Sequence, residues 1–406
     1  MSITLVASPR TANHMPSPAL AALKPCVEKA GFACSTIDLN IELFNDLRNE
    51  FSAYTEIDSY FQTDLRYLSQ NNFDLSPIQG EKNKMSVYSQ NLYNLHLQNW
   101  AARILQNKHD WIGVSLLSVN SVLYTLDLCT ELKTQDPSCK IVLGGPGVST
   151  FGIMGASNFG VFMQRAGLAD EYLAGEGEYA LVELLQGSTD IELKQIDNID
   201  VFPFPDYSDF NFKKYTNKNN AVAITGSRGC VRNCTFCDIK SAWKQYRFRS
   251  GKNIAEEIIN HYEKYGSTEF YFTDSLINGS LKSFGDFLDA MIEARNAGRI
   301  SDQVKWSGQF ICRPIHQFKE DWYKRMQLAG AKQLHIGIES GSEAVMHDMG
   351  KILSNDDIDY TIEMLTKYNI QCDMLMIVGY PTETEQDFNH TLDILERLSV
   401  DEEQGT

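Results

Sequence analysis

Short apolar runs alternate with amphipathic stretches along the first half of the chain, and this alternation predicts strands separated by helices. Five apolar runs are predicted as strands: Ile3–Ala7, Phe32–Leu39, Trp111–Leu117, Ile141–Leu143 and Glu171–Ala174. Helical spacing fills Ala19–Ala30, about Val122–Lys133 and a stretch that ends near Leu185. A series of strand–helix units implies a parallel sheet covered on both faces. We therefore predict a doubly wound, Rossmann-like α/β domain over residues 1–198.

An insertion of about residues 41–109 separates the second and third predicted strands. Helical spacing is found in Tyr54–Leu68 and Val87–Leu105, whereas Asn71–Lys84 has the composition of turns. Two interpretations of the insertion remain open. It is either a helical cap packed on the edge of the sheet or a lid over a substrate pocket.

A second alternating region follows residues 199–220, whose prolines and weak periodicity predict an extended linker. Its predicted strands are Ala221–Gly226, Glu269–Thr273, Lys305–Cys312, Gln333–Ile338 and Cys372–Val378. Helices are predicted near 253–265, 281–297, 319–329, 355–368 and 386–399. Five strand–helix units over residues 221–406 predict a partial, parallel (β/α) barrel.

The composition indicates a folded protein and disfavours several functional classes. The 406 residues are 43% apolar and 22% charged, which is typical of a folded protein. Thirty-six basic and 53 acidic residues give a net charge of −17, which disfavours binding to nucleic acid. Neither a membrane helix nor a signal peptide is recognisable, since the N-terminal apolar run covers only Ile3–Ala7. Nine cysteines without an export signal predict a cytoplasmic protein whose thiols are free or metal-bound.

The strongest chemical signal is a group of three cysteines, Cys230, Cys234 and Cys237. Thiolates suit iron–sulfur clusters and zinc, and structural zinc normally takes four ligands. No fourth cysteine or histidine follows at zinc-finger spacing. Three thiols would leave one iron of a [4Fe–4S] cluster open, as in a catalytic cluster. Zinc and a chance group of buried thiols are the alternatives.

The pattern Cys-x3-Cys-x-aromatic-Cys after a strand resembles the radical S-adenosylmethionine (SAM) superfamily. The resemblance implies that Cys230, Cys234 and Cys237 hold a [4Fe–4S] cluster and that SAM chelates its fourth iron. It also implies that Phe236 packs near the adenine. Cleavage of SAM then yields a 5′-deoxyadenosyl radical.

Further motifs resemble the same superfamily in the same order. Asp274 and Ser275 end the second strand of the region, where the superfamily binds the methionine amine, although Asp274 is equally a turn or N-cap residue. Arg313, in the stretch WSGQFICRP, is expected to meet either the SAM carboxylate or a structural carboxylate. Glu339 and Ser340 lie in GIESGS, which implies contact with the ribose or amino group of the cofactor.

The motif GYPTET resembles the G-L-P-G-E-T of one subgroup, with Tyr380 and Thr382 replacing two of its residues. A complete core of this superfamily usually has six strand–helix units, and five are counted here. We therefore expect a core that lacks its last unit, and a truncated, non-catalytic cluster-binding protein is one alternative.

Glycine turns in the first domain resemble those of the cobalamin-binding domains that precede many radical SAM cores. They are Gly144 and Gly145 after the fourth predicted strand, and Gly175 and Gly177 after the fifth. Glycines at strand ends let the backbone approach a large flat cofactor. The D-x-H-x-x-G motif that supplies a lower cobalt ligand is absent. The alternative is a Rossmann-like domain that binds nothing.

The resemblance implies a radical SAM enzyme that methylates an unactivated carbon or phosphorus with the help of cobalamin. The alternatives are a cobalamin-independent oxidation or rearrangement, or a tRNA methylthiotransferase. A small-molecule or peptide substrate and an electron donor such as flavodoxin or ferredoxin are the expected partners. A basic stretch around the cysteines suits either an anionic substrate or that donor; it contains Arg228, Arg232, Lys240, Lys244, Arg247, Arg249 and Lys252.

Overall fold

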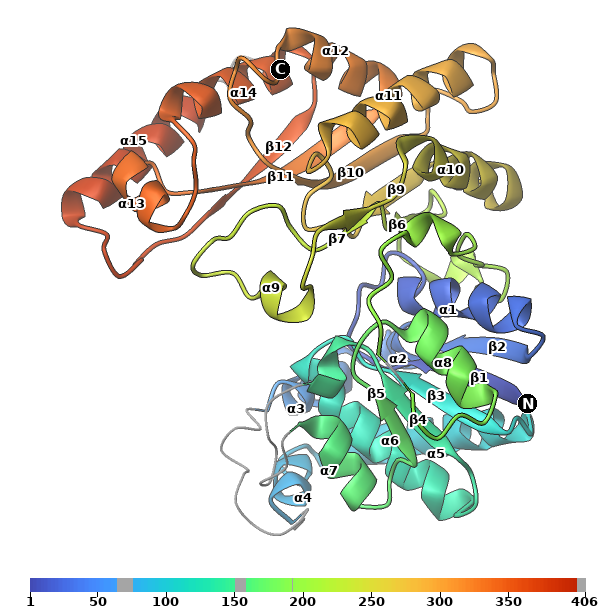
Figure 1. The fold of residues 1–406 in the computed structure, drawn as a ribbon. Coiled ribbons are helices and arrows are strands. Elements are labelled where there is room, and N and C mark those ends of the chain that lie inside the picture. Colours follow the sequence, from blue (N-terminus) through green and yellow to red (C-terminus); the bar gives the residue numbers. More distant parts are fainter. Residues whose placement is uncertain (64–75, 150–157, 192, 400–406) are drawn as a thin grey trace. The chain divides into compact units, whose positions relative to one another are not determined.

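The computed structural model describes residues 1–63, 76–149, 158–191 and 193–399 (Figure 1). The chain divides into two compact units. Unit 1 comprises residues 1–196 and 202–218, and unit 2 comprises residues 197–201 and 219–406. The segment for which the sequence predicts a linker is thus shared between the units, and most of it packs within unit 1. Tyr207 and Tyr215 of this segment are buried there.

Unit 1 contains a five-stranded parallel sheet in the order β2-β1-β3-β4-β5. The strands are β1 (Ser2–Ala7), β2 (Ala33–Asp38), β3 (Trp111–Ser115), β4 (Ile141–Gly144) and β5 (Glu171–Leu173). The strand order reverses between β1 and β3, so the sheet is doubly wound as predicted. The buried apolar residues of β1, β3 and β4 explain why these segments form its centre.

Eight α-helices are described in unit 1: α1 (Pro18–Lys29), α2 (Leu39–Leu47), α3 (Phe51–Phe61), α4 (Ser76–Lys82), α5 (Val87–Gln106), α6 (Val122–Gln135), α7 (Phe159–Arg165) and α8 (Gly177–Leu185). The turn predicted over Asn71–Lys84 is wrong in part, because α4 lies within it. Pro77 occupies the first turn of α4, where a missing N–H breaks no helical hydrogen bond. The predicted helix Tyr54–Leu68 overlaps α3, which begins at Phe51 and ends at Phe61; the last five predicted positions, 64–68, lie outside the described residues.

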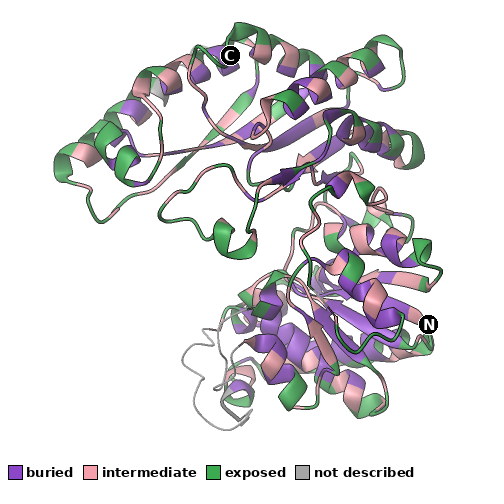
Figure 2. Cartoon of the chain, in the orientation of Figure 1, coloured by how far each residue is buried: buried purple, intermediate pink, exposed green. Residues whose placement is uncertain are grey.

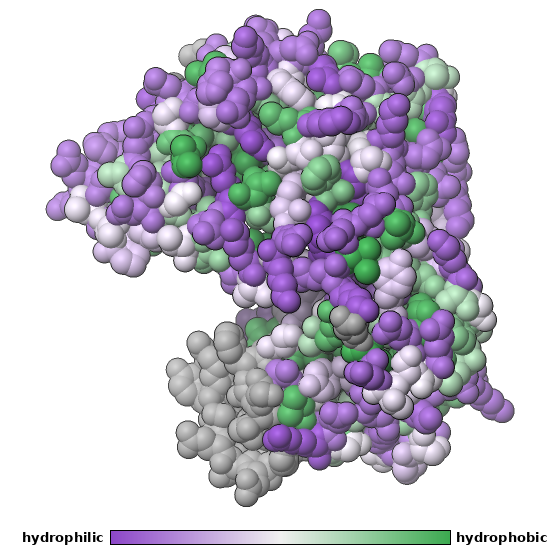
Figure 3. All heavy atoms as spheres, viewed as in Figure 1, coloured by the Kyte–Doolittle hydropathy of each residue, from purple (hydrophilic) through white to green (hydrophobic). Residues whose placement is uncertain are grey.

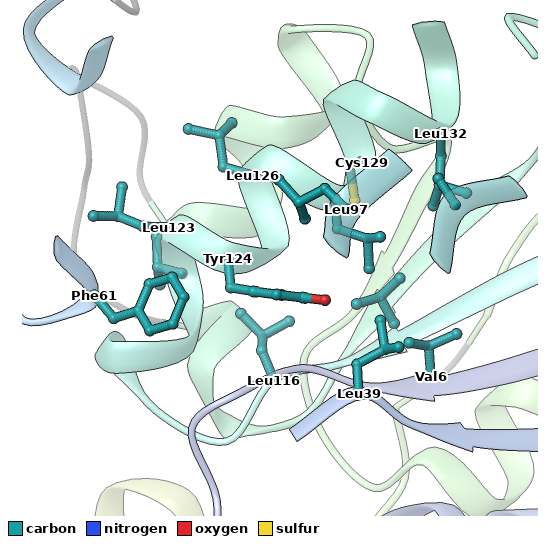
Figure 4. Close-up of a cluster of buried hydrophobic side chains, with 14 of the residues drawn as sticks. Val6, Leu39, Phe61, Leu97, Leu116, Leu123, Tyr124, Leu126, Cys129 and Leu132 are labelled. Atoms are coloured by element: carbon teal, nitrogen blue, oxygen red, sulfur yellow. The ribbon is translucent and has the colours of Figure 1, made fainter. Parts of the chain in front are cut away.

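The helices of the insertion pack against the rest of unit 1 and contribute side chains to its hydrophobic core. Side chains from α2, α3 and α5 share one buried cluster with β3, and Phe61, Leu97 and Leu116 are among its members (Figure 4). A buried polar chain reinforces this contact, since His96 lies 2.8 Å from the Asp46 carboxylate and 2.9 Å from the Tyr124 hydroxyl. The structure therefore favours the cap over the lid.

Unit 2 contains a second five-stranded parallel sheet, in the order β12-β11-β10-β9-β6. Its strands are β6 (Val222–Ile224), β9 (Glu269–Phe272), β10 (Lys305–Phe310), β11 (Ala331–Glu339) and β12 (Gln371–Met376). Each strand of this sheet pairs with the strand of the sheet that follows it in the chain, as expected for a growing (β/α) barrel. The predicted α/β class with two parallel sheets is confirmed.

The longer helices of unit 2 lie along one side of its sheet (Figure 1): α10 (Gly251–Tyr265), α11 (Leu281–Asn296), α12 (Glu320–Ala329), α14 (Asn355–Lys367) and α15 (Glu385–Ser399). The short helix α13 (Glu343–Asp348) follows β11 in the chain. Left-handed glycines, Gly266 and Gly330, end α10 and α12. Burial alternates along β11, with Leu334, Ile336 and Ile338 buried (Figure 2). One face of the sheet thus holds the apolar core, and the other is more open and polar.

The surface seen in Figure 3 is largely hydrophilic, with apolar side chains scattered over it. Among the described helices, none is both long and apolar enough to span a membrane.

Candidate cofactor site

A small hairpin that the sequence did not predict carries the cysteine motif. Strands β7 (Ser227–Arg228) and β8 (Arg247–Phe248) pair antiparallel, and the motif and the short helix α9 (Ile239–Ala242) lie between them. Gly229 begins the motif at φ +84°, and a Cβ there would lie 2.8 Å from the Gln245 carbonyl oxygen. A glycine is therefore needed where the two ends of this loop meet.

The three thiols differ in exposure. Cys230 and Cys234 are half-buried, Cys237 is exposed, and all three are free. Burial raises the pKa of the Cys230 and Cys234 thiols. The Arg232 N–H donates to Cys230 Sγ at 3.3 Å, a contact that favours a thiolate. Three soft donors in one loop fit an iron–sulfur cluster chemically, but nowhere in the described ranges do three Cys, His, Asp or Glu side chains converge closely enough to hold a metal ion.

Two distant segments hold the cysteine loop. The Thr235 N–H donates to the Met349 carbonyl at 3.0 Å, just after α13. The Tyr380 hydroxyl lies 2.7 Å from Thr235 Oγ1 and donates to the Asp348 carbonyl at 3.3 Å. Tyr380 is a residue at which GYPTET departs from the subgroup's motif, and here it joins the β12 end to the cysteine loop.

Asp274 is a buried structural contact of the loop that precedes the cysteines. Its side chain is 3% exposed and accepts the Gly226 N–H at 2.8 Å. Burial raises the pKa of this carboxyl to about 7, against an ordinary value of 3.8. It lines a cavity together with Tyr246 and Ser280. Ser275, next in the chain, is exposed.

The raised pKa of Asp274 predicts a pH dependence of stability. The folded protein keeps a proton that the unfolded chain releases near pH 4, so the free energy of unfolding falls as the pH rises from about 4 to about 7. The variant Asp274→Asn keeps an acceptor for the Gly226 N–H and cannot ionise. We expect it to raise the free energy of unfolding by about 1–3 kcal/mol at pH 8, and little at about pH 3.5, below the pKa of the unfolded carboxyl. Urea denaturation at both pH values measures this, with the exposed Asp286→Asn as control; equal effects at both pH values would contradict it.

The other residues predicted to bind SAM make contacts within unit 2. Glu339 ends β11 at φ +72° and pairs with Lys351 at 2.8 Å. Ser340 is buried; its hydroxyl lies 3.4 Å from Thr391 Oγ1 and accepts the Ser342 N–H at 3.1 Å.

Arg313 donates to the carbonyls of Asn278 and Gly279 at 2.6 and 2.9 Å, and burial lowers the pKa of its guanidinium. These partners are backbone groups rather than the structural carboxylate that the sequence offered as one possibility. Phe236 is 43% exposed in the cysteine loop.

The glycines of unit 1 gather at the carboxyl ends of its strands. Gly144 ends β4, and a Cβ there would meet no atom within 4 Å. Gly145 has φ +92°, and a Cβ would lie 2.4 Å from the Leu116 carbonyl oxygen after β3. Gly175 follows β5, and Gly177 begins α8. These turns lie at the edge where open α/β sheets bind ligands, and Gly144 is the one of the four with open space at its Cβ position.

The sequence did not reveal Lys351 as a site residue, and it suggested more exposed basic side chains around the cysteines than the structure shows. Lys351 lies twelve residues beyond Glu339, and only the fold reveals that they pair. Arg247 and Arg249 are buried, and Arg249 forms an ion pair with Glu257 at 2.5 Å. The exposed basic residues of the stretch are therefore fewer than the sequence indicated.

A comparison with protein-family models matches residues 224–395 to the radical SAM superfamily. The chain therefore carries a radical SAM domain. Enzymes of this superfamily use a [4Fe–4S] cluster and SAM, and the matched residues include the cysteine loop and the motifs described above.

Relatives of this radical SAM protein include proteins that are named as methyltransferases, methylthiotransferases and a cyclase. It is 26% identical to an uncharacterized methyltransferase of Pyrococcus horikoshii over 75% of this chain and 68% of the relative. It is 22% identical to a tRNA-2-methylthio-N(6)-dimethylallyladenosine synthase of Buchnera aphidicola over 78% of this chain and 73% of that enzyme. The chain is accordingly an enzyme of the radical SAM type.

Among solved structures, the fold is similar to that of TsrM from Kitasatospora setae, a radical SAM methyltransferase determined with cobalamin and a [4Fe–4S] cluster bound. The TM-score is 0.69 at 15% identity, and the match covers 98% of this chain and 73% of TsrM. A match that spans both units supports the two-sheet fold.

Proposed function

We propose that this protein is a cobalamin-dependent radical SAM methyltransferase that acts on an unactivated carbon or phosphorus. One observation carries the proposal: the same chain holds a radical SAM domain and a doubly wound unit with glycine turns at the carboxyl ends of its strands. Bound cobalamin would supply the methyl group, and the cluster with SAM would supply the hydrogen-abstracting radical.

Each cofactor has a candidate set of residues. Cys230, Cys234 and Cys237 are the proposed ligands of the cluster, and Phe236 is the proposed neighbour of the SAM adenine. Gly144 and Gly145 are proposed to let cobalamin approach the backbone of unit 1, together with the turn that contains Gly175 and Gly177. Leu117 and Val119, exposed just after β3, add apolar surface at the same sheet edge.

Polar side chains on the open face of the unit 2 sheet favour a small polar substrate. His335 of β11 lies 2.8 Å from Asp373 of β12, which also accepts from Gln333 Nε2 at 2.7 Å. Gln309 of β10 pairs in register with His335 and shares this face. An Asp that holds His Nδ1 leaves Nε2 to accept a hydrogen bond from a substrate hydroxyl or amine. We infer that the substrate carries such a group.

An acidic electron donor such as flavodoxin or ferredoxin is the proposed reductant. Lys240, Lys244 and Lys252 are exposed near the cysteine loop, against a chain of net charge −17. This local positive charge would steer an acidic partner towards the cluster.

Cofactor content tests the proposal. Anaerobic reconstitution with iron, sulfide and hydroxocobalamin, followed by desalting, should leave about four iron and one cobalt per chain. Incubation with SAM, a reductant and candidate substrates should yield S-adenosylhomocysteine together with 5′-deoxyadenosine. Iron without cobalt would contradict the role of cobalamin and favour a radical oxidation or rearrangement.

A large side chain at Gly144 should block cobalamin specifically. Gly144→Trp projects into open space, so we expect the fold and the iron content to persist while cobalt falls at least tenfold. Gly80→Trp, which also enters open space but lies in α4, is the matched control and should keep its cobalt.

A methylthiotransferase is the second candidate because the relatives include such enzymes. These enzymes carry a second cluster on three N-terminal cysteines. In unit 1 the cysteines are spread over separate elements: Cys26 in α1, Cys34 in β2, Cys129 in α6 and Cys139 before β4. About eight iron per chain, with no cobalt, would nevertheless favour this function over the first.

A further inference from the structure

Lys351 lies at the end of a loop that folds back over the carboxyl end of β11. Its Nζ donates to the Gly337 carbonyl oxygen and to Glu339 Oε1, the latter at 2.8 Å. Both side chains of the pair are only 12% exposed. Removing one partner of such a largely buried ion pair is destabilising, because the other charge is left uncompensated.

The same loop is joined to the cysteine motif by its backbone. Met349 accepts the Thr235 N–H, and Gly350, at φ +78°, approaches so closely that a Cβ would lie 3.1 Å from the Asn233 carbonyl oxygen. The pair is therefore carried on a segment in direct contact with the residues on either side of Cys234.

The geometry places the pair close to Cys234. A Cβ at Gly350, the residue before Lys351, would lie 3.8 Å from the Cys234 Cα. The two opposite charges of the pair are therefore carried next to a proposed ligand of the cluster.

We propose that Lys351 and Glu339 form a neutral charge pair that positions the cysteine loop and sets the reduction potential of the cluster. The inference rests on the proposed function, since it requires the cluster to bind at these cysteines. Net charge near an iron–sulfur cluster is one of the main determinants of its potential. An unpaired carboxylate disfavours the added electron, and an unpaired ammonium favours it.

Single and double variants separate the charge effect from a merely structural role. Lys351→Met leaves Glu339 unpaired, so the midpoint potential should become more negative. Glu339→Gln leaves Lys351 unpaired, so the potential should become more positive. The double variant should return close to the wild-type value, and Lys351→Arg should change it little. Anaerobic redox titration of the reconstituted full chain, followed by its visible absorption, provides the readout.

The pair Lys332–Glu269 offers a matched control within unit 2. It joins a lysine and a glutamate at 2.5 Å near the amino end of β11, roughly 20 Å along the strand from Glu339. Lys332→Met should leave the cluster potential unchanged.

Shifts of the same sign in the two single variants, or no shift in either, would overturn the inference. If Lys351→Met cannot retain iron while Lys351→Arg does, the positioning role is supported, and the Glu339→Gln shift decides the electrostatic role. Failure of the wild-type chain to bind about four iron would instead overturn the proposed function, and this inference with it.

Discussion

Replacing Cys234 with alanine should abolish the visible absorption of the reconstituted protein and its cleavage of SAM. Each of the three cysteines is proposed to supply one protein ligand, so the loss of one would leave two irons open to solvent and the cluster should dissociate. The iron content should fall from about four per chain to below about one, while the far-ultraviolet circular dichroism stays nearly unchanged. The fold should survive because Cys234 lies in an irregular loop outside the core.

Cys372→Ala is the matched control for this experiment. Cys372 is also free and half-buried, but it lies in β12, outside the cysteine motif. Its variant should retain iron and activity. A Cys234→Ala protein that kept its absorption would show that the ligand assignment is wrong.

Gly251→Ala should destabilise unit 2 by about 3 kcal/mol or more. Gly251 begins α10, and a Cβ there would lie 2.1 Å from the Ser283 carbonyl oxygen and 2.2 Å from the Phe287 backbone nitrogen of α11. These neighbours are backbone atoms and cannot move aside by changing a rotamer. The two helices would have to separate, which opens the core around Phe287.

Thermal denaturation of the full chain, with hydrogen exchange to locate the weakened segment, measures the effect. Amides of α10 and α11 should lose protection in the Gly251→Ala variant, whereas those of unit 1 should keep it. Gly80→Ala, whose new methyl group meets no atom within 4 Å, should change the stability little. An unchanged melting temperature for Gly251→Ala would contradict the close helix contact.

The strands and the cysteine motif were predictable because their signals are local. Apolar runs such as Ile3–Ala7 mark buried strands, and three cysteines close in sequence need no tertiary information. The contacts of these residues were not predictable. Glu339 was expected to bind a cofactor, and its partner Lys351 became evident only when a loop folded back over the strand.

The burial of charged side chains was also not predictable, because it depends on residues that are distant in the sequence. Arg249 looked like part of an exposed basic patch, because the sequence does not reveal that Glu257 lies beside it in the core. From the sequence, Asp274 could be either a cofactor ligand or a turn residue. Its hydrogen bond to Gly226 was not predictable, because it depends on the pairing of β6 with β9. Helix α4 was missed because Pro77 and Gly80 are more typical of turns.

The different strand orders of the two sheets have a consequence for folding. In unit 2 each strand of the five-stranded sheet pairs with the strand of that sheet that precedes it in the chain, so the sheet can grow in the order of synthesis. In unit 1, β1 pairs with β2 on one side, but its other edge must wait for β3, because Ile3 pairs with Trp111 and the whole insertion lies between them. Closing that long loop costs entropy before the second pairing repays it. Unit 1 should therefore contain the slower folding step, and chaperones that shield the open edge of β1 would be needed mainly while the insertion emerges.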